Sequence, residues 1–210
     1  MSAFKSPFYV IPEFISPLMC EEVIDACEFT VPELDKEGKE VKTTRTCEGA
    51  EGIIYERLFG IIPELQQYYD FEYKGTERMA FEWFPQESIG EFQCENSNFL
   101  RGKWLRTKSR DLSGILFLSD YQEQTPFEKE FEVYGGKLEF NQHAFGFNPQ
   151  RGTLVLFPSD PHFINITSRV FVGDLFQARI QIAATTPYIY QPDNFPGNYT
   201  TWFKDELNTQ

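Results

Sequence analysis

The sequence predicts a mainly β fold in which helices support a β-sandwich or jelly roll. Three observations lead to this class. Two segments with helical character come first, many short apolar runs separated by turn residues follow, and no useful helical periodicity interrupts those runs. The 210 residues are enough for one such domain with a sizeable core. We therefore expect one domain with helical support over residues 7–70, a β core over 77–184 and an irregular tail over 185–210.

The first helix is indicated by its start signal. Residues 7–14 have the composition of a short strand. Ser16 and Pro17 then supply an N-cap and a proline at the first helical position. We expect the helix to continue through Glu21 and Glu22 to Cys27, and these early acidic residues are favourably placed against the helix dipole.

A second helix follows a charged segment. Residues 33–51 are charged and contain glycine, so they are expected to form a solvated loop. An amphipathic pattern over residues 52–69 predicts the helix itself. Pro63 should kink or split this helix, because proline has no backbone N–H to donate.

The β core begins beyond residue 77. The predicted strands cover residues 79–83, 114–118, 134–140, 152–157, 163–166 and 175–183. Gly135 and Gly136 are expected to form a tight bend that leaves no room for a Cβ atom. The aromatic residues expected in the core are Phe81, Trp83, Phe92, Phe117 and Phe140.

Charge and hydropathy exclude several classes of protein. The net charge of −13 repels phosphate backbones, so we expect no nucleic-acid partner in the absence of a concentrated basic patch. No apolar run approaches the length of a membrane span, so no membrane role is expected. The N-terminal residues lack a basic stretch followed by an apolar one, and we therefore expect a cytoplasmic protein.

Cysteines and histidines limit the available chemistry. The four cysteines are scattered and form no C-x-x-C pair, so they are expected to be free, buried thiols. The only histidines are His143 and His162, and any mechanism that needs imidazole depends on these two.

Four ordered segments carry a family resemblance. They are residues 8–20 (FYVIPEFISPLMC), 110–119 (RDLSGILFLS), 134–140 (YGGKLEF) and 152–159 (GTLVLFPS), the last followed by His162. In this order they resemble the prolyl 4-hydroxylase-like Fe(II)/2-oxoglutarate dioxygenases over most of residues 7–184. The resemblance implies a double-stranded β-helix, which is a jelly roll. It also implies Fe(II) and 2-oxoglutarate as cofactors, with ascorbate as a further one, and O₂ as co-substrate for hydroxylation of a C–H bond. The implied substrate is a proline or another side chain of a peptide or protein.

The same resemblance implies a set of metal ligands. Iron that binds an oxoacid and O₂ suits two imidazoles and one carboxylate. His162 matches the family's second histidine and Glu95 its acid, whereas Gln93 stands where the first histidine belongs. The implied metal ligands are therefore Gln93, Glu95 and His162, with a weakly coordinating amide in place of one imidazole.

Two features of this motif stay open. Alternative registers are Glu95-x-Ser97 and Asn96-x-Asn98, and neither supplies a histidine. His143 follows the glycine-containing strand by a few residues. The family takes no ligand from that position, so His143 is expected to be a surface or hydrogen-bonding residue.

The far carboxylate of 2-oxoglutarate needs a cation, which an arginine fork supplies well. By resemblance Arg179 takes this role with Gln181 beside it, and Arg169 is the alternative. On a strand, Gln177, Arg179 and Gln181 share one face. That face either surrounds a polar cavity inside the barrel or meets solvent.

Two functions follow. The first is an Fe(II)/2-oxoglutarate dioxygenase of the prolyl 4-hydroxylase type. The second is a catalytically inactive jelly roll kept for binding or for structure, including a role in a virus particle, since fold does not fix function. The missing first histidine motivates the second hypothesis.

Overall fold

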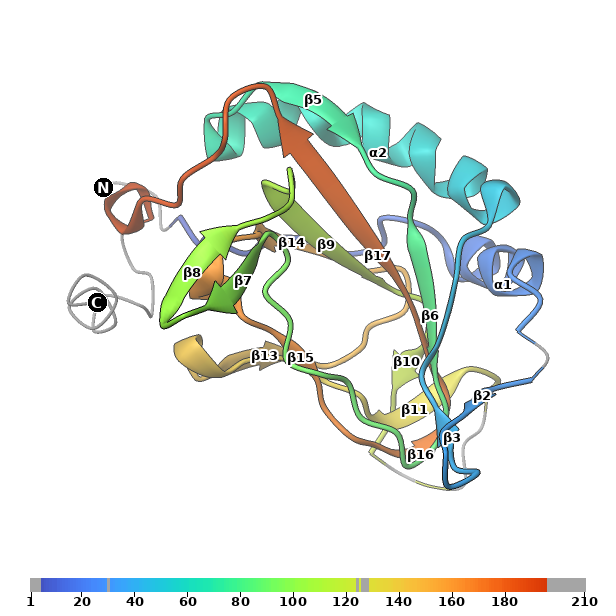
Figure 1. The fold of residues 1–210 in the computed structure, drawn as a ribbon. Coiled ribbons are helices and arrows are strands. Elements are labelled where there is room, and N and C mark those ends of the chain that lie inside the picture. The colour runs from blue at the N-terminus through green and yellow to red at the C-terminus, as the bar shows by residue number, and fades with distance from the viewer. Residues whose placement is uncertain (1–4, 30, 124, 126–128, 196–210) are drawn as a thin grey trace.

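Strand β17 (Leu175–Ala184) lies in the middle of the large sheet and positions the rest of the fold. The computed structural model describes residues 5–29, 31–123, 125 and 129–195. β17 pairs antiparallel with β9 (Leu112–Phe117) on one side and with β6 (Ala80–Phe84) on the other, so that Arg179 lies opposite Ile115 and Ala80. The sheet order is β1-β14-β9-β17-β6-β4, and β5 also pairs with β17 (Figure 1). The remaining strands of this sheet are β1 (Tyr9–Ile11), β14 (Leu154–Pro158), β4 (Thr43–Arg45) and β5 (Tyr73–Thr76).

Shorter strands form the second layer of the jelly roll. One sheet has the order β10-β11-β16 and another the order β13-β12-β15. Their bounds are β10 (Asp120–Tyr121), β11 (Glu132–Gly135), β16 (Val170–Gly173), β13 (Phe145–Phe147), β12 (Leu138–Phe140) and β15 (Ile166–Thr167). Residues 87–93 run beside them, with backbone hydrogen bonds from Glu87 to Val170 (2.8 Å) and between Gln93 and Asn165 in both directions (2.8 and 3.0 Å). This extended segment brings residues 93–95 to the inside of the barrel.

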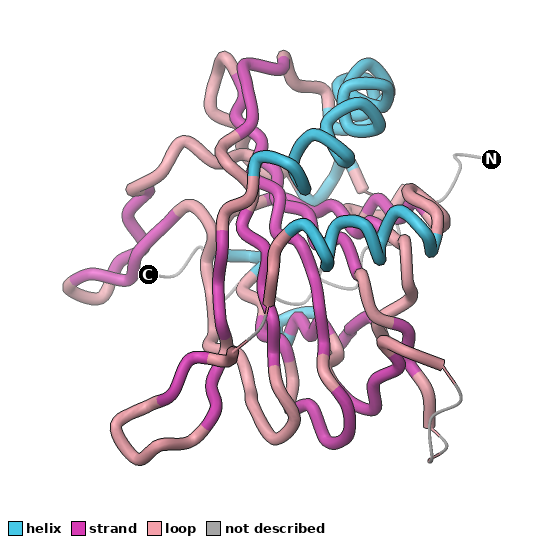
Figure 2. Tube along the Cα trace, turned by 90° about the vertical axis from the view of Figure 1, so that its right-hand side faces the viewer, coloured by secondary structure: helices cyan, strands magenta, loops and turns pink. Residues whose placement is uncertain are grey.

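Two helices cover the outer face of the large sheet, on the same side of the molecule (Figure 2). They are α1 (Pro17–Ala26) and α2 (Glu48–Tyr69). α2 buries one stripe of apolar side chains that includes Ile54, Leu58 and Leu65, and these join the main core cluster. No helix of the described residues is long and apolar enough to cross a membrane.

Two small hairpins and three 3₁₀ turns complete the described chain. The hairpins are β2 (Glu33–Leu34) with β3 (Glu40–Val41), and β7 (Ser97–Leu100) with β8 (Lys103–Arg106). The 3₁₀ turns are η1 (Asn141–His143), η2 (Pro161–Phe163) and η3 (Pro192–Asn194). Residues 185–191 have no helix or strand, and the predicted tail beyond residue 195 lies outside the described residues.

The helical predictions are confirmed in part. The Ser16 hydroxyl accepts a hydrogen bond from the Met19 N–H (3.2 Å), as expected of an N-cap. α2 begins before residue 52 and continues through Pro63, so the expected split is wrong. The lost hydrogen bond is outweighed by the apolar stripe that the unbroken helix buries. Residues 33–51 are not only a loop, because they contain β2, β3 and β4, the last paired with β6.

The strand predictions need smaller corrections. The run over residues 134–140 divides into β11 and β12 at its glycine pair, and Gly135 has a positive φ of 96°. A Cβ atom on Gly135 would lie 2.2 Å from the Arg169 carbonyl oxygen, which confirms that this bend has no room for one. Phe92 was expected in the core but is 61% exposed, because the segment before Gln93 turns this ring outward, whereas the other four aromatics are buried.

Candidate functional site

The polar face of β17 lies inside the barrel. Gln177, Arg179 and Gln181 are all buried, which agrees with the prediction that this face surrounds a polar cavity inside the barrel. Antiparallel pairing with β9 and β6 on both sides holds this strand straight through the core. The three side chains therefore meet polar groups from other strands and not solvent.

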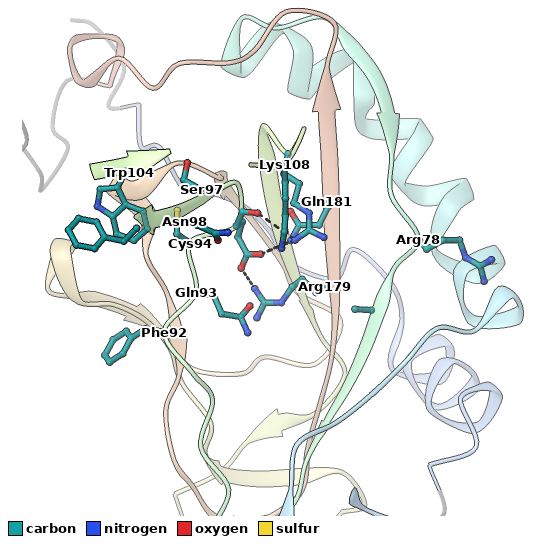
Figure 3. A pocket seen from close by; sticks show the side chains of 14 residues that line it. Arg78, Phe92, Gln93, Cys94, Ser97, Asn98, Trp104, Lys108, Arg179 and Gln181 are labelled. Carbon is teal, nitrogen blue, oxygen red and sulfur yellow. Dashed lines mark hydrogen bonds and ion pairs between the residues drawn. The ribbon is translucent and has the colours of Figure 1, made fainter. Parts of the chain in front are cut away.

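Arg179 holds two buried carboxylates. Its Nη1 donates to Glu95 Oε1, and its Nη2 lies 3.5 Å from Glu82 Oε2. Asn165 contributes as well, since its Oδ1 accepts from Arg179 Nη1 (3.4 Å) and its Nδ2 donates to Glu95 Oε1 (3.3 Å). We call Arg179, Glu95, Glu82 and Asn165 the central cluster; Figure 3 shows Arg179 in contact with an acidic side chain between β17 and the segment of Gln93.

Amide and hydroxyl groups complete the hydrogen bonding around the central cluster. Gln181 Nε2 donates to Glu95 Oε2 (2.9 Å), while its Oε1 accepts from the Ser113 hydroxyl (2.7 Å). Gln177 Nε2 donates to Glu82 Oε2 (2.7 Å). Both oxygens of the Glu95 carboxylate thus have donors within the protein.

Opposite charges determine the ionisation of this region. Burial by itself would raise the pKa of Glu82, but the charges of Arg179 and Lys42 and the hydrogen bond from Gln177 lower it overall. Burial would likewise lower the pKa of Arg179, but Glu82 and Glu95 raise it. Lys42 Nζ reaches Glu82 Oε1 at 3.1 Å. Two cations, Arg179 and Lys42, thus stand against the two buried carboxylates of this region.

A cavity of about 460 Å³ opens beside the central cluster. Polar groups at its inner end include Gln93, Glu95 and Arg179, and its rim carries aromatic rings and cations (Figure 3). Phe92, Phe99, Trp104, Lys108 and Arg110 also line the cavity. Cys94 also lines the cavity, and burial raises the pKa of its thiol to about 11, so the thiol stays protonated at neutral pH. The four cysteines are free as expected, although Cys47 and Cys94 are only partly buried.

The structure brings two of the three predicted metal ligands together. Gln93 and Glu95 both line the cavity. His162 does not line it: its Nδ1 lies 2.8 Å from Asp160 Oδ1, and its ring packs 5.3 Å from that of Tyr190. The proline of η2 and the Asp160 cap fix His162 in this position.

The remaining candidates also lie away from the central cluster. Arg169 forms an exposed ion pair with Glu87, which places it at the surface. His143 is buried, so the hydrogen-bonding expectation for it is correct and the surface one is wrong. Its Nε2 lies 2.7 Å from the His162 carbonyl oxygen, and burial lowers its pKa to about 4. It has no contact with Glu95 among the described residues.

The side chains as arranged do not fit an Fe(II) ion. No group of three His, Cys, Asp or Glu in the described part of the chain is placed to hold a metal. An iron ion on Glu95 would have to displace the positively charged Arg179, and no imidazole lines the cavity. The ligand set of Gln93, Glu95 and His162, and the oxoacid role of Arg179, stay predictions that this arrangement does not support.

The fold is that of the prolyl 4-hydroxylases, the jelly-roll class of Fe(II)/2-oxoglutarate oxygenases. The viral collagen prolyl hydroxylase of Paramecium bursaria Chlorella virus-1, solved with 2-oxoglutarate, aligns with a TM-score of 0.61 and 16% identity over 85% of this chain and 96% of that one. A Trichoplax adhaerens prolyl hydroxylase in complex with a hypoxia-inducible factor peptide aligns with a TM-score of 0.62 and 12% identity over 85% of this chain and 84% of that one. A Pseudomonas putida prolyl 4-hydroxylase aligns with a TM-score of 0.60 and 11% identity over 86% of this chain and 94% of that one. No family model and no curated protein match the sequence. At these identities the likeness establishes the fold.

Sequence reasoning missed two members of the central cluster. Glu82 stands in the strand run of Phe81 and Trp83, and its alternation with them could have indicated an inward carboxylate. Asn165 lies three residues after His162, and no sequence signal distinguishes it. Its inward position depends on the pairing with Gln93, a long-range contact.

Proposed function

We propose that this chain is an iron-independent binding protein built on the prolyl hydroxylase fold, which takes a protein segment at the mouth of the cavity. One observation supports this above all: Arg179 occupies the Glu95 carboxylate that the fold family would offer to iron. A buried ion pair satisfied in this way strongly resists loss of one partner. The oxygenase fold then serves as a scaffold for recognition, since chemistry depends on the site and not on the fold.

The cavity supports the binding half of the proposal. Its rim combines aromatic and cationic side chains, which suit a polypeptide with both apolar and acidic groups. The fold can present a peptide site of this kind, because the similar Trichoplax protein was solved with a peptide bound. Hydroxylation of a protein side chain by Fe(II) and 2-oxoglutarate is the competing hypothesis, and the two make opposite predictions for one titration.

The test is anaerobic addition of Fe(II) to purified protein with 2-oxoglutarate, monitored for the visible charge-transfer band of an iron–oxoacid chelate. We expect no saturable band and no succinate formation in air. A matched pair of variants checks the reasoning. Gln93→His with Asn165→His should give no band while Arg179 keeps its ion pair with Glu95, whereas adding Arg179→Gln frees this carboxylate beside two imidazoles and should gain one. A saturable band in the unmodified protein that is lost in His162→Ala would overturn the proposal, and succinate formation in air would establish the oxygenase.

A further inference from the structure

The β7–β8 hairpin stands apart from both layers of the jelly roll. It forms a two-stranded sheet of its own, and in the described part of the chain neither of its strands pairs with another sheet. Both views show it projecting from the body on the side away from α1 and α2 (Figures 1 and 2). A lone two-stranded hairpin is only marginally stable in water. Its free backbone edges can accept a further strand.

The hairpin exposes large apolar side chains. Phe99, Leu100 and Leu105 are 55%, 50% and 49% exposed. Phe99 pairs across the strands with Trp104, and their ring centroids are 5.3 Å apart. The register places Phe99 and Trp104 on one face of the hairpin and Leu100 and Leu105 on the other, so each face carries its own apolar pair. Paired exposed apolar side chains mark an interaction site more often than scattered single residues do.

The hairpin is also the basic region of an acidic protein. Five of the 19 Lys and Arg residues lie between residues 96 and 110, and none of the 32 Asp and Glu residues does. Arg106 and Arg110 are paired with Asp111 and Glu77. The three remaining cations form no ion pair with any described residue; they are Arg101, Lys103 and Lys108.

Charge complementarity identifies the kind of partner. Three unpaired cations beside apolar side chains attract a ligand that is negatively charged and apolar at once. A nucleic acid meets the first condition, but the excess negative charge of the rest of the chain repels a long phosphate backbone. An extended acidic polypeptide with Leu or Phe side chains meets both conditions and can also pair with a free strand edge.

We propose that the β7–β8 hairpin, with the flanking residues to Arg110, is the docking surface for an acidic protein segment that carries apolar side chains. This inference rests on the proposed binding function and identifies the surface and the chemistry of the partner. The iron titration tests whether the chain works without iron, and peptide binding tests whether the hairpin is a docking surface, so failure of one is distinguishable from failure of the other.

The experiment measures fluorescence anisotropy of a labelled peptide of alternating Glu and Leu, with an alternating Lys and Leu peptide and a thymidine oligonucleotide as comparison probes. We expect only the acidic peptide to bind, and more weakly at higher salt. Replacing Arg101, Lys103 and Lys108 together by Gln should weaken binding about tenfold. The matched control replaces the exposed Lys36, Arg57 and Lys74 by Gln, which removes the same charge elsewhere and should change binding less than twofold.

A second pair of variants tests the apolar contribution. Leu105→Ala should weaken binding several-fold, whereas Leu18→Ala, at an exposed position on α1, should not. Both sites are exposed, so neither change should affect the fold, which circular dichroism can check. Equal binding of the acidic and basic peptides, preference for the oligonucleotide, or equal loss in the hairpin and control variants would overturn the proposal.

Discussion

Glu82 and Glu95, which come from different segments of the barrel, both contact the guanidinium of Arg179. Each carboxylate is almost fully buried, and Arg179 is the cation that both of them share. Lys42 contributes only to Glu82, and Arg110 approaches Glu95 Oε2 no closer than 3.7 Å. The stability of the core therefore depends on Arg179 more than on any exposed charge.

Arg179→Met should destabilise the protein by about 3–5 kcal/mol, because it leaves two buried carboxylates without their shared cation. The loss should be smaller at pH 5 than at pH 8, since carboxylates deprived of a cation have raised pKa values and take up protons more readily at low pH. Urea unfolding at both pH values measures this. Arg169→Met removes the exposed ion pair with Glu87 and should cost less than about 1 kcal/mol. Equal costs for the two variants would contradict the central role of Arg179.

Acid should weaken the fold through Glu82. The pKa of this carboxyl is lowered in the native state from its ordinary value of 4.5. Its contribution to stability is therefore complete above pH 4.5 and is lost as the pH falls through the lower native pKa. In Glu82→Gln the free energy of unfolding should be lower at neutral pH and should change less below pH 4.5. Glu91→Gln, at an exposed position, should reproduce the unmodified pH profile.

Acid should also weaken the fold through His143, at a higher pH than through Glu82. Burial holds its native pKa at about 4, against an ordinary value of 6.5. Between these values the unfolded chain is protonated and the native imidazole is neutral, so stability declines as the pH falls through this range. We expect a loss of roughly 2 kcal/mol between pH 7 and pH 5 that is absent from His143→Gln. Titration of the imidazole by NMR gives a direct check, and a native pKa near 6.5 would contradict this account.

Gly135→Ala should destabilise the protein by more than about 2 kcal/mol. The new Cβ would collide with the Arg169 carbonyl oxygen, and the positive φ is unfavourable for alanine. Gly60→Ala is the matched control, because nothing lies within 4 Å of a Cβ at this position in α2. This substitution should stabilise the protein by about 0.5–1 kcal/mol. Thermal unfolding of both variants tests the pair.

Local patterns predicted much of the fold, and long-range pairing accounts for the parts that they missed. The N-cap at Ser16 and the apolar runs of β9, β14 and β17 depend on neighbouring residues, so the sequence showed them directly. The strand Thr43–Arg45 consists of polar residues and exists because it pairs with β6. Without this pairing, its three residues have the composition of a loop.

For the candidate site, too, local patterns predicted some features, and long-range contacts account for the others. Alternation along β17 placed Arg179 and its two glutamines correctly on one buried face. No local pattern could show that Arg179 would pair with Glu95, since the two residues come from segments 84 positions apart. Nor could it show that the cap at Asp160 would hold the His162 ring away from the cavity. These outcomes depend on the tertiary arrangement.

The position of β17 has a consequence for how the chain folds during its synthesis. This strand lies between β9 and β6, yet it is almost the last of the described elements to leave the ribosome. Until it arrives, β9 and β6 have no common neighbour, and the carboxylates of Glu82 and Glu95 lack the cation that they share. The large sheet must therefore stay incomplete, with β9 and β6 unpaired on one side, until residues 175–184 have left the ribosome.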